Sequence, residues 1–244
     1  MQPKDRLILA LDVDTMAQAE ALVEKLHDLV GVFKVGMQLY NSEGPEVVRR
    51  IQAGGGKVFA DLKFHDIPNT VAQAGKVMTG HGVFMYNVHT AGGKKMMAEA
   101  VAATGQKAAE INIAKPLVIG VTVLTSIDRD TLNQEVGIQG LVEEQVVKWA
   151  KLAQEAGLDG VVASPQEVKA IRQACGKDFN LVIPGIRPAW AAANDQKRIM
   201  TPREAIAAGA TYIVVGRPIT HAPDPREAAE KIVAEIEEGL RDVE

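Results

Sequence analysis

The chain has almost no cysteine and no long hydrophobic run, and both absences restrict where it can work. Cys175 is its only cysteine, so no disulfide can form within the chain, as expected for a protein of the reducing cytosol. The apolar run Leu7–Leu11 is short and stops at Asp12, which predicts neither a signal peptide nor a membrane span. We therefore expect a cytoplasmic protein that does not bind membranes.

Aromatic residues and excess positive charge are also scarce. Aromatic residues are 4% of the chain and apolar residues 47%, so the core must consist of aliphatic side chains, which suits parallel strands buried on both faces. The 27 Lys and Arg residues are outnumbered by 31 Asp and Glu residues, and the net charge is −4. A mildly acidic chain has no general affinity for nucleic acid, so any bound anion must be held by local groups.

Short apolar runs alternate with helix-like segments along the whole chain. Strands are expected at residues 7–13, 32–36, 57–62, 83–88, 117–124, 160–163, 181–183 and 212–215. Helices are expected at residues 16–29, 45–53, 71–80, 94–104, 142–156, 165–174, 202–208 and 225–240. This α/β pattern predicts one (β/α)8 TIM barrel domain over residues 1–244, with an open doubly wound sheet as the alternative.

Polar side chains gather at the carboxyl ends of the expected strands, where barrel enzymes carry their chemistry. They are Asp12, Lys34, Asp61, Lys63, Asn87, His89, Thr125, Ser126, Arg187 and Arg217. The opposite ends of the strands show no comparable set. Polar groups from many strands that meet at one rim predict an enzyme.

Asp61 and Lys63 are two residues apart in an expected strand and should point to the same side. Lys34 and Asp66 complete a set of four charges of alternating sign. A partly buried set of this kind is costly unless every member is paired, and pairing would keep the lysines protonated. A protonated lysine can deliver a proton to a developing carbanion. The alternatives are a structural ion-pair cluster and, for Asp66, a helix cap.

The loops after the seventh and eighth expected strands have the features of a phosphate site. Barrels often bind phosphate there through backbone N–H groups. Gly185 and Arg187 follow the seventh strand, and Gly216 and Arg217 follow the eighth. The connection 187–200 is the longest without a convincing helix or strand, and we interpret it as a lid that grips a phosphate, with a surface loop as the alternative.

The sequence does not favour a metal or a cofactor. His65 and His89 lie near several carboxylates, but no His-x-x-x-His pair or cysteine cluster has the spacing of metal ligands. No dinucleotide-binding or Walker motif follows a strand. The glycine run 54–56 precedes the third expected strand, which is the wrong end for a phosphate site. We therefore expect no metal and no cofactor.

The ten residues 61–70, DLKFHDIPNT, resemble the signature of the orotidine 5′-monophosphate decarboxylase family. The short Asp-x-Lys-x-x-Asp core is shared with related barrels. The resemblance continues through LALD (9–12), FKVG (33–36), VLTS (123–126), PGIR (184–187), DQ (195–196) and VGRPIT (215–220). It implies the barrel fold, loss of CO2 from orotidine 5′-monophosphate to give UMP, no cofactor or metal, and a homodimer with shared active sites.

The resemblance also implies roles for single residues. Lys63 would be the acid that protonates C6 of the pyrimidine, and Asp61 would lie beside the departing carboxylate. Lys34 and Asp12 would bind ribose hydroxyls and complete the charge network.

The remaining residues implied by the resemblance bind the substrate from other sides. Asp66 and Thr70 would reach the site of the neighbouring subunit, and Ile67 belongs to the same binding segment. Thr125 would lie by the pyrimidine ring, with Ser126 as the alternative. The phosphate would be held by Arg187, Gln196, Gly216 and Arg217.

Three other interpretations compete with this one. The first is a magnesium-dependent barrel such as hexulose-6-phosphate synthase, which carries an acidic metal ligand where this chain has Lys34. The second is a catalytically silent binder of a phosphorylated ligand, which would not need Lys63. The third is one domain of a larger fused enzyme, but the first expected strand and the last expected helix lie close to the chain ends, so we expect a free-standing protein.

Overall fold

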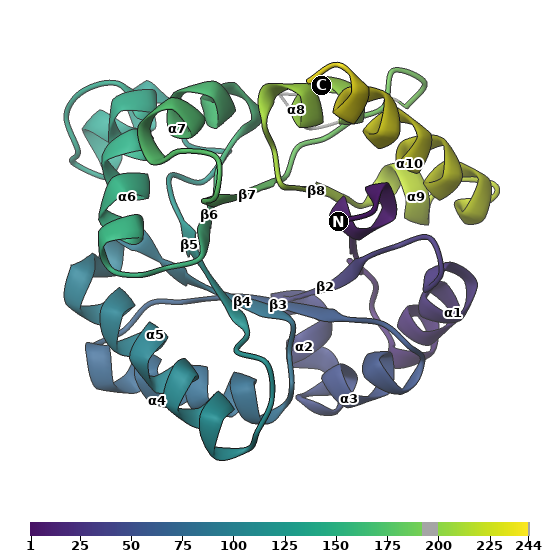
Figure 1. Ribbon diagram of the computed structural model, residues 1–244, viewed down its shortest axis with the longest axis horizontal. Coiled ribbons are helices and arrows are strands. Elements are labelled where there is room, and N and C mark those ends of the chain that lie inside the picture. The colour runs from purple at the N-terminus through teal and green to yellow at the C-terminus, as the bar shows by residue number, and fades with distance from the viewer. Residues whose placement is uncertain (192–199, 244) are drawn as a thin grey trace.

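Eight parallel strands close into a barrel in the computed structural model, which describes residues 1–191 and 200–243 (Figure 1). The strands are β1 Leu7–Ala10, β2 Val32–Gly36, β3 Val58–Phe64, β4 Met85–His89, β5 Leu117–Val121, β6 Gly160–Val162, β7 Asn180–Ile183 and β8 Tyr212–Val215. Each strand pairs with the next, and β8 pairs with β1, so all carboxyl ends lie at one end of the barrel. The predicted (β/α)8 architecture is confirmed, and the open sheet is excluded.

Helices connect the strands and form a ring around them (Figure 1). Within the described residues the α-helices are α1 Met16–Leu26, α2 Met37–Glu43, α3 Glu46–Ala53, α4 Pro68–Gly80, α5 Gly93–Glu110, α6 Val142–Glu155, α7 Val168–Cys175, α8 Pro202–Ala208, α9 Arg217–Thr220 and α10 Pro225–Arg241. Short 3-10 turns occur at Pro3–Arg6, Thr90–Gly92 and Pro165–Glu167, and a π-type turn occurs at Thr131–Glu135.

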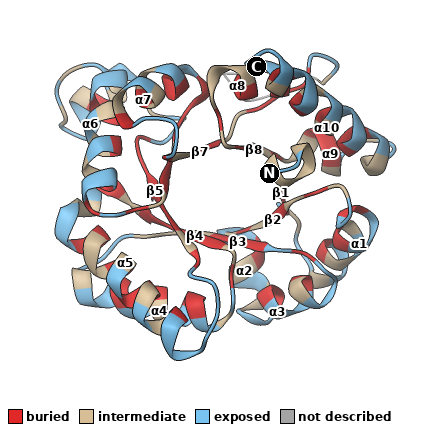
Figure 2. Cartoon of the chain, in the orientation of Figure 1, coloured by how far each residue is buried: buried red, intermediate tan, exposed pale blue. Residues whose placement is uncertain are grey.

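The strands separate two apolar layers, and Figure 2 shows that buried residues concentrate on them. One cluster takes one residue from every strand except β6. Its members are Ile8, Val32, Phe59, Met85, Ile119, Val182 and Tyr212. In β1 the neighbours of Ile8, which are Leu7 and Leu9, belong to the other cluster, shared with the helices. Side chains alternate between the two sides of a strand, so every strand is buried on both faces. Each fully buried aliphatic side chain contributes about 1.5–3 kcal/mol to folding.

The expected and observed elements differ mainly in their bounds. The strands β2 and β8 have the expected bounds, whereas β1 and β5 end at Ala10 and Val121, earlier than expected. Just beyond these two ends, the backbone N–H groups of Leu11 and Thr122 still donate to the carbonyls of Lys34 and Val162 on the neighbouring strands. The helices α2 and α9 were not expected, because seven and four residues are too few to show a helical period.

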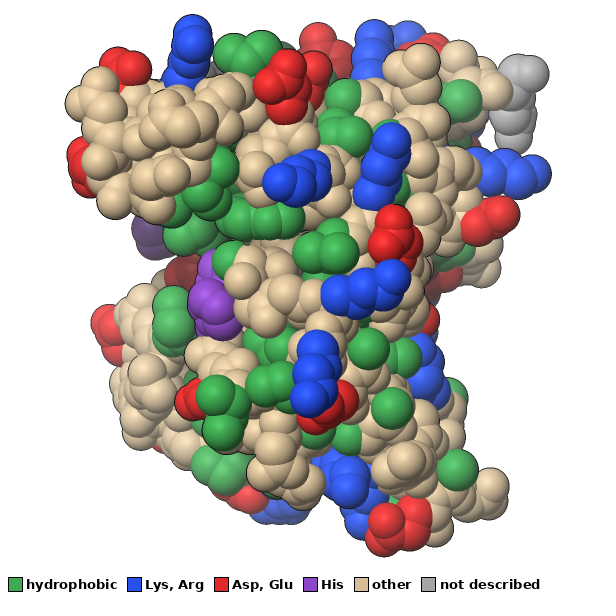
Figure 3. Space-filling view, turned by 90° about the vertical axis from the view of Figure 1, so that its left-hand side faces the viewer, with side chains coloured by type: hydrophobic (Ala, Val, Ile, Leu, Met, Phe, Trp, Pro, Cys, Tyr) green, Lys and Arg blue, Asp and Glu red, His purple; other side chains and the backbone are tan. Residues whose placement is uncertain are grey.

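The surface mixes charges of both signs. Figure 3 shows one face on which lysine and arginine side chains alternate with acidic ones and with small hydrophobic areas. Among the helices of the described residues, none has both the length and the apolar character needed to cross a bilayer.

Candidate active site

Charged side chains from neighbouring strands meet at the carboxyl end of the barrel. Nζ of Lys63 lies 2.7 Å from Oδ1 of Asp61, and Nζ of Lys34 lies 3.3 Å from Oδ2 of the same carboxylate. The Lys34 ammonium also lies 3.3 Å from Oδ1 of Asp12, just after β1. Four charges of alternating sign therefore form one chain of contacts, in the order Asp12, Lys34, Asp61, Lys63.

The inner members of this network are largely shielded from water. The side chains of Lys34 and Asp61 are 12% and 14% exposed. Burial acts to raise the pKa of Asp61, but the ammonium groups of Lys34 and Lys63, with hydrogen bonds from Lys63 and Asn87, outweigh it and lower this pKa below its usual value. Asp61 is therefore ionised at neutral pH and holds two positive charges beside it.

Strand β3 is irregular where it carries Asp61 and Lys63. Between its pairing residues Ala60 and Phe64, β3 advances four residues while β4 advances two, so extra backbone leaves the ladder as a bulge. Lys63 lies in this bulge with a φ of 53°, a left-handed backbone conformation that residues other than glycine seldom adopt. The two side chains meet as expected, but an irregular backbone, and not a regular pleat, brings them together.

Asn87 of β4 contacts both Asp61 and Lys63. The side chain of Asn87 is fully buried. Its Oδ1 accepts a hydrogen bond from the backbone N–H of Lys63 at 2.8 Å, and its Nδ2 donates to Oδ1 of Asp61 at 2.7 Å. From the sequence, Asn87 is one of the polar residues expected at the strand ends, but no role was predicted for it. The available signal was an amide side chain in the middle of a strand that is otherwise mostly apolar.

A cavity of about 190 Å³ opens beside the network. Lys34, Asp61 and Lys63 form one part of its wall, and Thr125, in the connection after β5, forms another. The rest of the wall is mainly apolar and includes one valine from each of four strands, Val121, Val162, Val182 and Val214. Charges beside an apolar wall interact more strongly than they do in water, so the cavity suits a ligand on which charge develops.

The start of α4 is at the surface. Asp66, Ile67 and Thr70 are exposed, and the side chain of Ile67 is among the most exposed hydrophobic groups of the described residues. Oδ1 of Asp66 accepts from the N–H of Ile67 at 2.6 Å, but the N-cap of α4 is Ile67 itself, so Asp66 is not the helix cap. Across the described residues Asp66 makes no ion pair with Lys34 or Lys63, and the expected four-charge set is incomplete in one chain.

The loops expected to bind phosphate lie next to the network. A Cβ placed on Gly216 would lie 3.7 Å from Oδ2 of Asp12, so the end of β8 approaches the charged rim closely. Arg217 is the first residue of α9 and is partly exposed, whereas Arg187 is buried. Gln196 lies outside the described residues, as does most of the segment expected to form a lid.

Two histidines stand near the network. The rings of His65 and His89 have their centroids 5.4 Å apart. Burial lowers the pKa of His89, and His65 and Lys63 lower it further, so its ring is neutral at pH 7. Among the described residues, no group of three or more His, Cys, Asp or Glu side chains is arranged to hold a metal ion.

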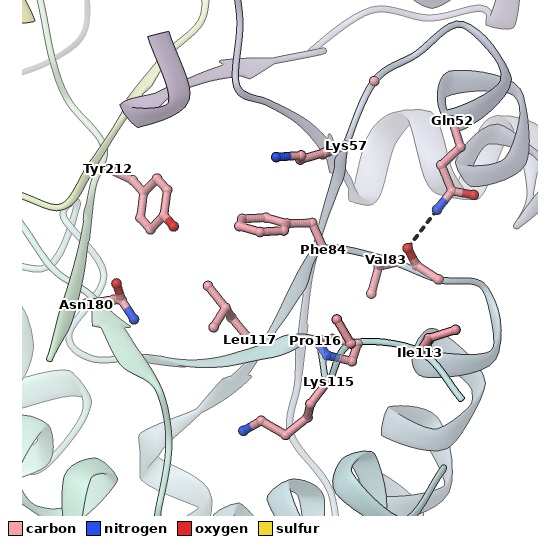
Figure 4. Close-up of a pocket in the computed structure, with 13 residues that line it drawn as sticks. Gln52, Lys57, Val83, Phe84, Ile113, Lys115, Pro116, Leu117, Asn180 and Tyr212 are labelled. Atoms are coloured by element: carbon pink, nitrogen blue, oxygen red, sulfur yellow. Dashed lines mark hydrogen bonds between the residues drawn. The ribbon is translucent and has the colours of Figure 1, made fainter. Parts of the chain in front are cut away.

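A larger cavity, of about 620 Å³, lies at the amino ends of the strands (Figure 4). Phe84 and Tyr212 face each other across it, and the ammonium of Lys57 lies 5.5 Å from the Phe84 ring centre. Lys115 also lines it and forms an ion pair with Asp159. No carboxylate belongs to its wall as described, so it offers no counterpart of the Asp61 network.

Comparisons with known proteins agree with this geometry. A sequence model described as "Orotidine 5′-phosphate decarboxylase / HUMPS family" matches residues 5–232. A Moorella thermoacetica protein named orotidine 5′-phosphate decarboxylase is 56% identical over 237 residues, which cover 97% of this chain and 94% of that protein. A Geobacter sulfurreducens protein of the same name is 53% identical over 238 residues, with 98% of each chain covered.

A solved structure extends the likeness to three dimensions. The crystal structure of orotidine 5′-phosphate decarboxylase from Lactobacillus acidophilus superposes with a TM-score of 0.84 at 39% identity, covering 94% of this chain and 98% of that one. The similarity therefore includes every strand of the barrel and not only the signature segment. With a family match and identities of this extent, the chain belongs to the orotidine 5′-phosphate decarboxylase / HUMPS family.

Proposed function

We propose that this chain removes CO2 from orotidine 5′-monophosphate to give UMP, the last step of de novo pyrimidine nucleotide synthesis. The observation that carries the proposal is the contact of Asp61 with both Lys34 and Lys63 beside an apolar cavity. Two relatives that are 53% and 56% identical over nearly the whole chain bear the name of this enzyme.

The chemistry requires a proton donor next to a forming carbanion. When the bond between C6 and the carboxyl carbon breaks, CO2 leaves and the electron pair stays on C6. The Lys63 ammonium stabilises this charge and then donates its proton to C6, which leaves a neutral amine on Lys63. Asp61 keeps Lys63 protonated before the reaction and lies beside the departing carboxylate, and Lys34 balances the charge of Asp61.

The rest of the substrate is bound by the other residues of the rim. Lys34 and Asp12, which contact each other at 3.3 Å, bind the ribose hydroxyls, the role that the family resemblance implies for them. Thr125 contacts the pyrimidine ring from the other side of the cavity. The phosphate is held by Arg187, Gln196, Gly216 and Arg217. Its binding energy, gained far from C6, supports orientation of the reacting ring.

The active enzyme is a homodimer in this proposal. Asp66, Ile67 and Thr70 are exposed at the start of α4, and Asp66 lacks an ion-pair partner among the described residues of its own chain. They contribute to the active site of the partner subunit, where Asp66 supplies the missing member of the charge network. This arrangement also covers the exposed Ile67 side chain.

The reaction is proposed to need neither a metal nor a cofactor. Lys34 occupies the place at which magnesium-dependent relatives carry an acidic ligand, and its ammonium would repel a metal ion. The whole chain, residues 1–244, acts as one catalytic domain, and its place of action is the cytoplasm.

The test follows the absorbance of orotidine 5′-monophosphate in the presence of EDTA, with the wild-type protein and a Lys63→Ala variant. We expect rapid conversion by the wild type and almost none by the variant. Titration with UMP, which requires no turnover, controls for intact binding in both proteins. A wild type that binds UMP without converting the substrate would overturn the proposal in favour of a silent binder, and activity abolished by EDTA would favour a magnesium-dependent enzyme.

A further inference from the structure

The geometry points to Asn87 as a positioning residue that sets the orientation of both Lys63 and Asp61. The inference concerns the same site and so rests on the decarboxylase function proposed above. Asn87 lies on β4, whereas the charged residues that it contacts lie on β3, and it is the group that joins the two strands at the irregular point.

The chemistry of the two partners fixes the orientation of the Asn87 amide. A backbone N–H can only donate, so the atom 2.8 Å from the Lys63 nitrogen must be the amide oxygen. An ionised carboxylate can only accept, so the atom 2.7 Å from Oδ1 of Asp61 must be the amide nitrogen. Only an amide side chain supplies one acceptor and two donors in this shape, and a flipped amide would break both bonds.

The bond to the Lys63 N–H replaces a missing bond of the sheet. In a regular ladder a backbone carbonyl of a neighbouring strand would accept this N–H, but β3 bulges at this point. The side chain of Asn87 satisfies it instead, in a fully buried position where an unpaired N–H is unfavourable. It therefore stabilises the left-handed backbone of Lys63, with its φ of 53°, which carries the side chain toward Asp61.

The second bond acts on the acidic partner of Lys63. Oδ1 of Asp61 accepts hydrogen bonds from Nδ2 of Asn87 and Nζ of Lys63, both at 2.7 Å. Oδ2 of Asp61 forms the ion pair with Lys34. Asn87 therefore fixes which oxygen faces which lysine. Because the amide is neutral, it does so without changing the charge balance of the site. Loss of the amide frees the Asp61 carboxylate to rotate and the Lys63 backbone to leave the left-handed region.

The first experiment compares Asn87→Ala with Thr104→Val in the decarboxylation assay and in thermal unfolding. Thr104 is a matched control, because it is also fully buried and forms a 2.7 Å bond to Tyr86, the neighbour of Asn87, on the helix side of β4. We expect both variants to lower Tm. Only Asn87→Ala should lower kcat, by about 100-fold, with KM changed by less than about threefold, as expected for misplacement of the reacting groups.

The second experiment uses Asn87→Asp and a readout that a purely structural role would not change. A protonated carboxyl group offers one acceptor and one donor, as the amide does, whereas an ionised one repels Asp61 and cannot donate. The kcat of Asn87→Asp relative to the wild type should therefore rise as pH falls, by about tenfold per pH unit, until the introduced carboxyl is protonated. Thr104→Val should give a ratio that does not depend on pH.

A crystal structure of Asn87→Ala separates this inference from the proposed function, because it needs no turnover. We expect Lys63 to leave the positive-φ region and its Nζ to move away from Asp61. A variant that retains φ near 53° and the 2.7 Å contact would overturn the inference even if the wild type is an efficient decarboxylase. Wild-type kcat in Asn87→Ala, or a flat pH ratio for Asn87→Asp, would overturn it as well.

Discussion

The two ends of the barrel hold charge in different ways. At the carboxyl ends of the strands, Lys34 and Lys63 share the shielded carboxylate of Asp61 beside a cavity of about 190 Å³. At the amino ends, the cavity is about 620 Å³, but Lys57 lies over the ring of Phe84 and forms no ion pair with any described carboxylate. The coupled charges of Lys34, Asp61 and Lys63 therefore line the smaller of these two cavities.

Charges on different strands are thus coupled at the end where we propose catalysis, whereas the larger cavity lies at the other end of the barrel. Lys115 of the larger cavity pairs with Asp159 at 2.9 Å, and Asp159 also accepts a hydrogen bond from the backbone N–H of Val118 at 2.8 Å. These contacts hold Asp159, which directly precedes β6, against the start of β5. The amino ends of the strands therefore contribute to stability, as is usual for this face of a TIM barrel.

The largest effect is expected when one lysine is removed from each end of the barrel. Lys63→Ala should lower kcat by at least about 10⁴-fold, because it removes both a general acid and a charge that stabilises the carbanion. Lys57→Ala should leave kcat within about twofold of the wild type, since no carboxylate among the described residues lines the cavity beside it. Steady-state kinetics at saturating substrate measure both effects. Equal losses in the two variants would remove the functional distinction between the ends.

A smaller effect is expected from the loop after β8, which we propose binds phosphate. Arg217→Ala should lower kcat/KM by about 10–100-fold, the size of a lost charge-assisted hydrogen bond, while the chemical step stays intact. Substrate saturation curves separate the two parameters. Loss of turnover at saturating substrate with an unchanged KM would contradict the assignment of Arg217 to phosphate binding.

At the amino ends of the strands, Asp159→Ala should reduce the stability of the protein and leave catalysis unchanged. The substitution removes the Lys115 ion pair and leaves the Val118 N–H without its acceptor, a loss of about 1–2 kcal/mol. Urea unfolding measures the change, and kcat of the folded variant serves as the control. A fall in kcat without a change in stability would show that the amino ends of the strands take part in turnover.

The smallest effect should appear in the pH dependence of stability. The folded protein lowers the pKa of Asp61, so the stability that this group contributes is present above its unfolded pKa and is lost as pH falls through the lower folded value. The free energy of unfolding should therefore decline more steeply toward acid pH in the wild type than in Asp61→Asn. Urea titrations at several acid pH values measure the two slopes, and parallel slopes would show that the network does not stabilise ionised Asp61.

Several features of the site were predictable because they follow from local sequence. Alternation of apolar runs and helical segments was sufficient for the barrel, since each unit buries its strand on both faces. Strand ends then placed Lys34, Asp61 and Thr125 at one rim, where the structure has them lining the same cavity. The role of Gln196 and the proposed lid stay predictions, because those residues lie outside the described part of the chain.

Other features depend on contacts between residues far apart in the sequence. The expected link of Asp66 to the lysines does not form within one chain, because the residue lies on an exposed helix start and not inside the rim. The cavity at the amino ends was not predicted either. It is lined by segments from residue 52 to residue 212, and no local pattern indicates that they surround a common space.

The order of strands and helices, the aliphatic core and the charged residues at the carboxyl rim can all be predicted from the sequence, because each is set by the spacing of residue types along the chain. How Lys63 faces Asp61 cannot be predicted in this way and follows from tertiary contacts. That geometry depends on a bulge between β3 and β4, a left-handed backbone and the buried amide of Asn87. The register of two strands, and the side chain that satisfies the backbone where the register slips, are set by packing between distant segments and not by local periodicity.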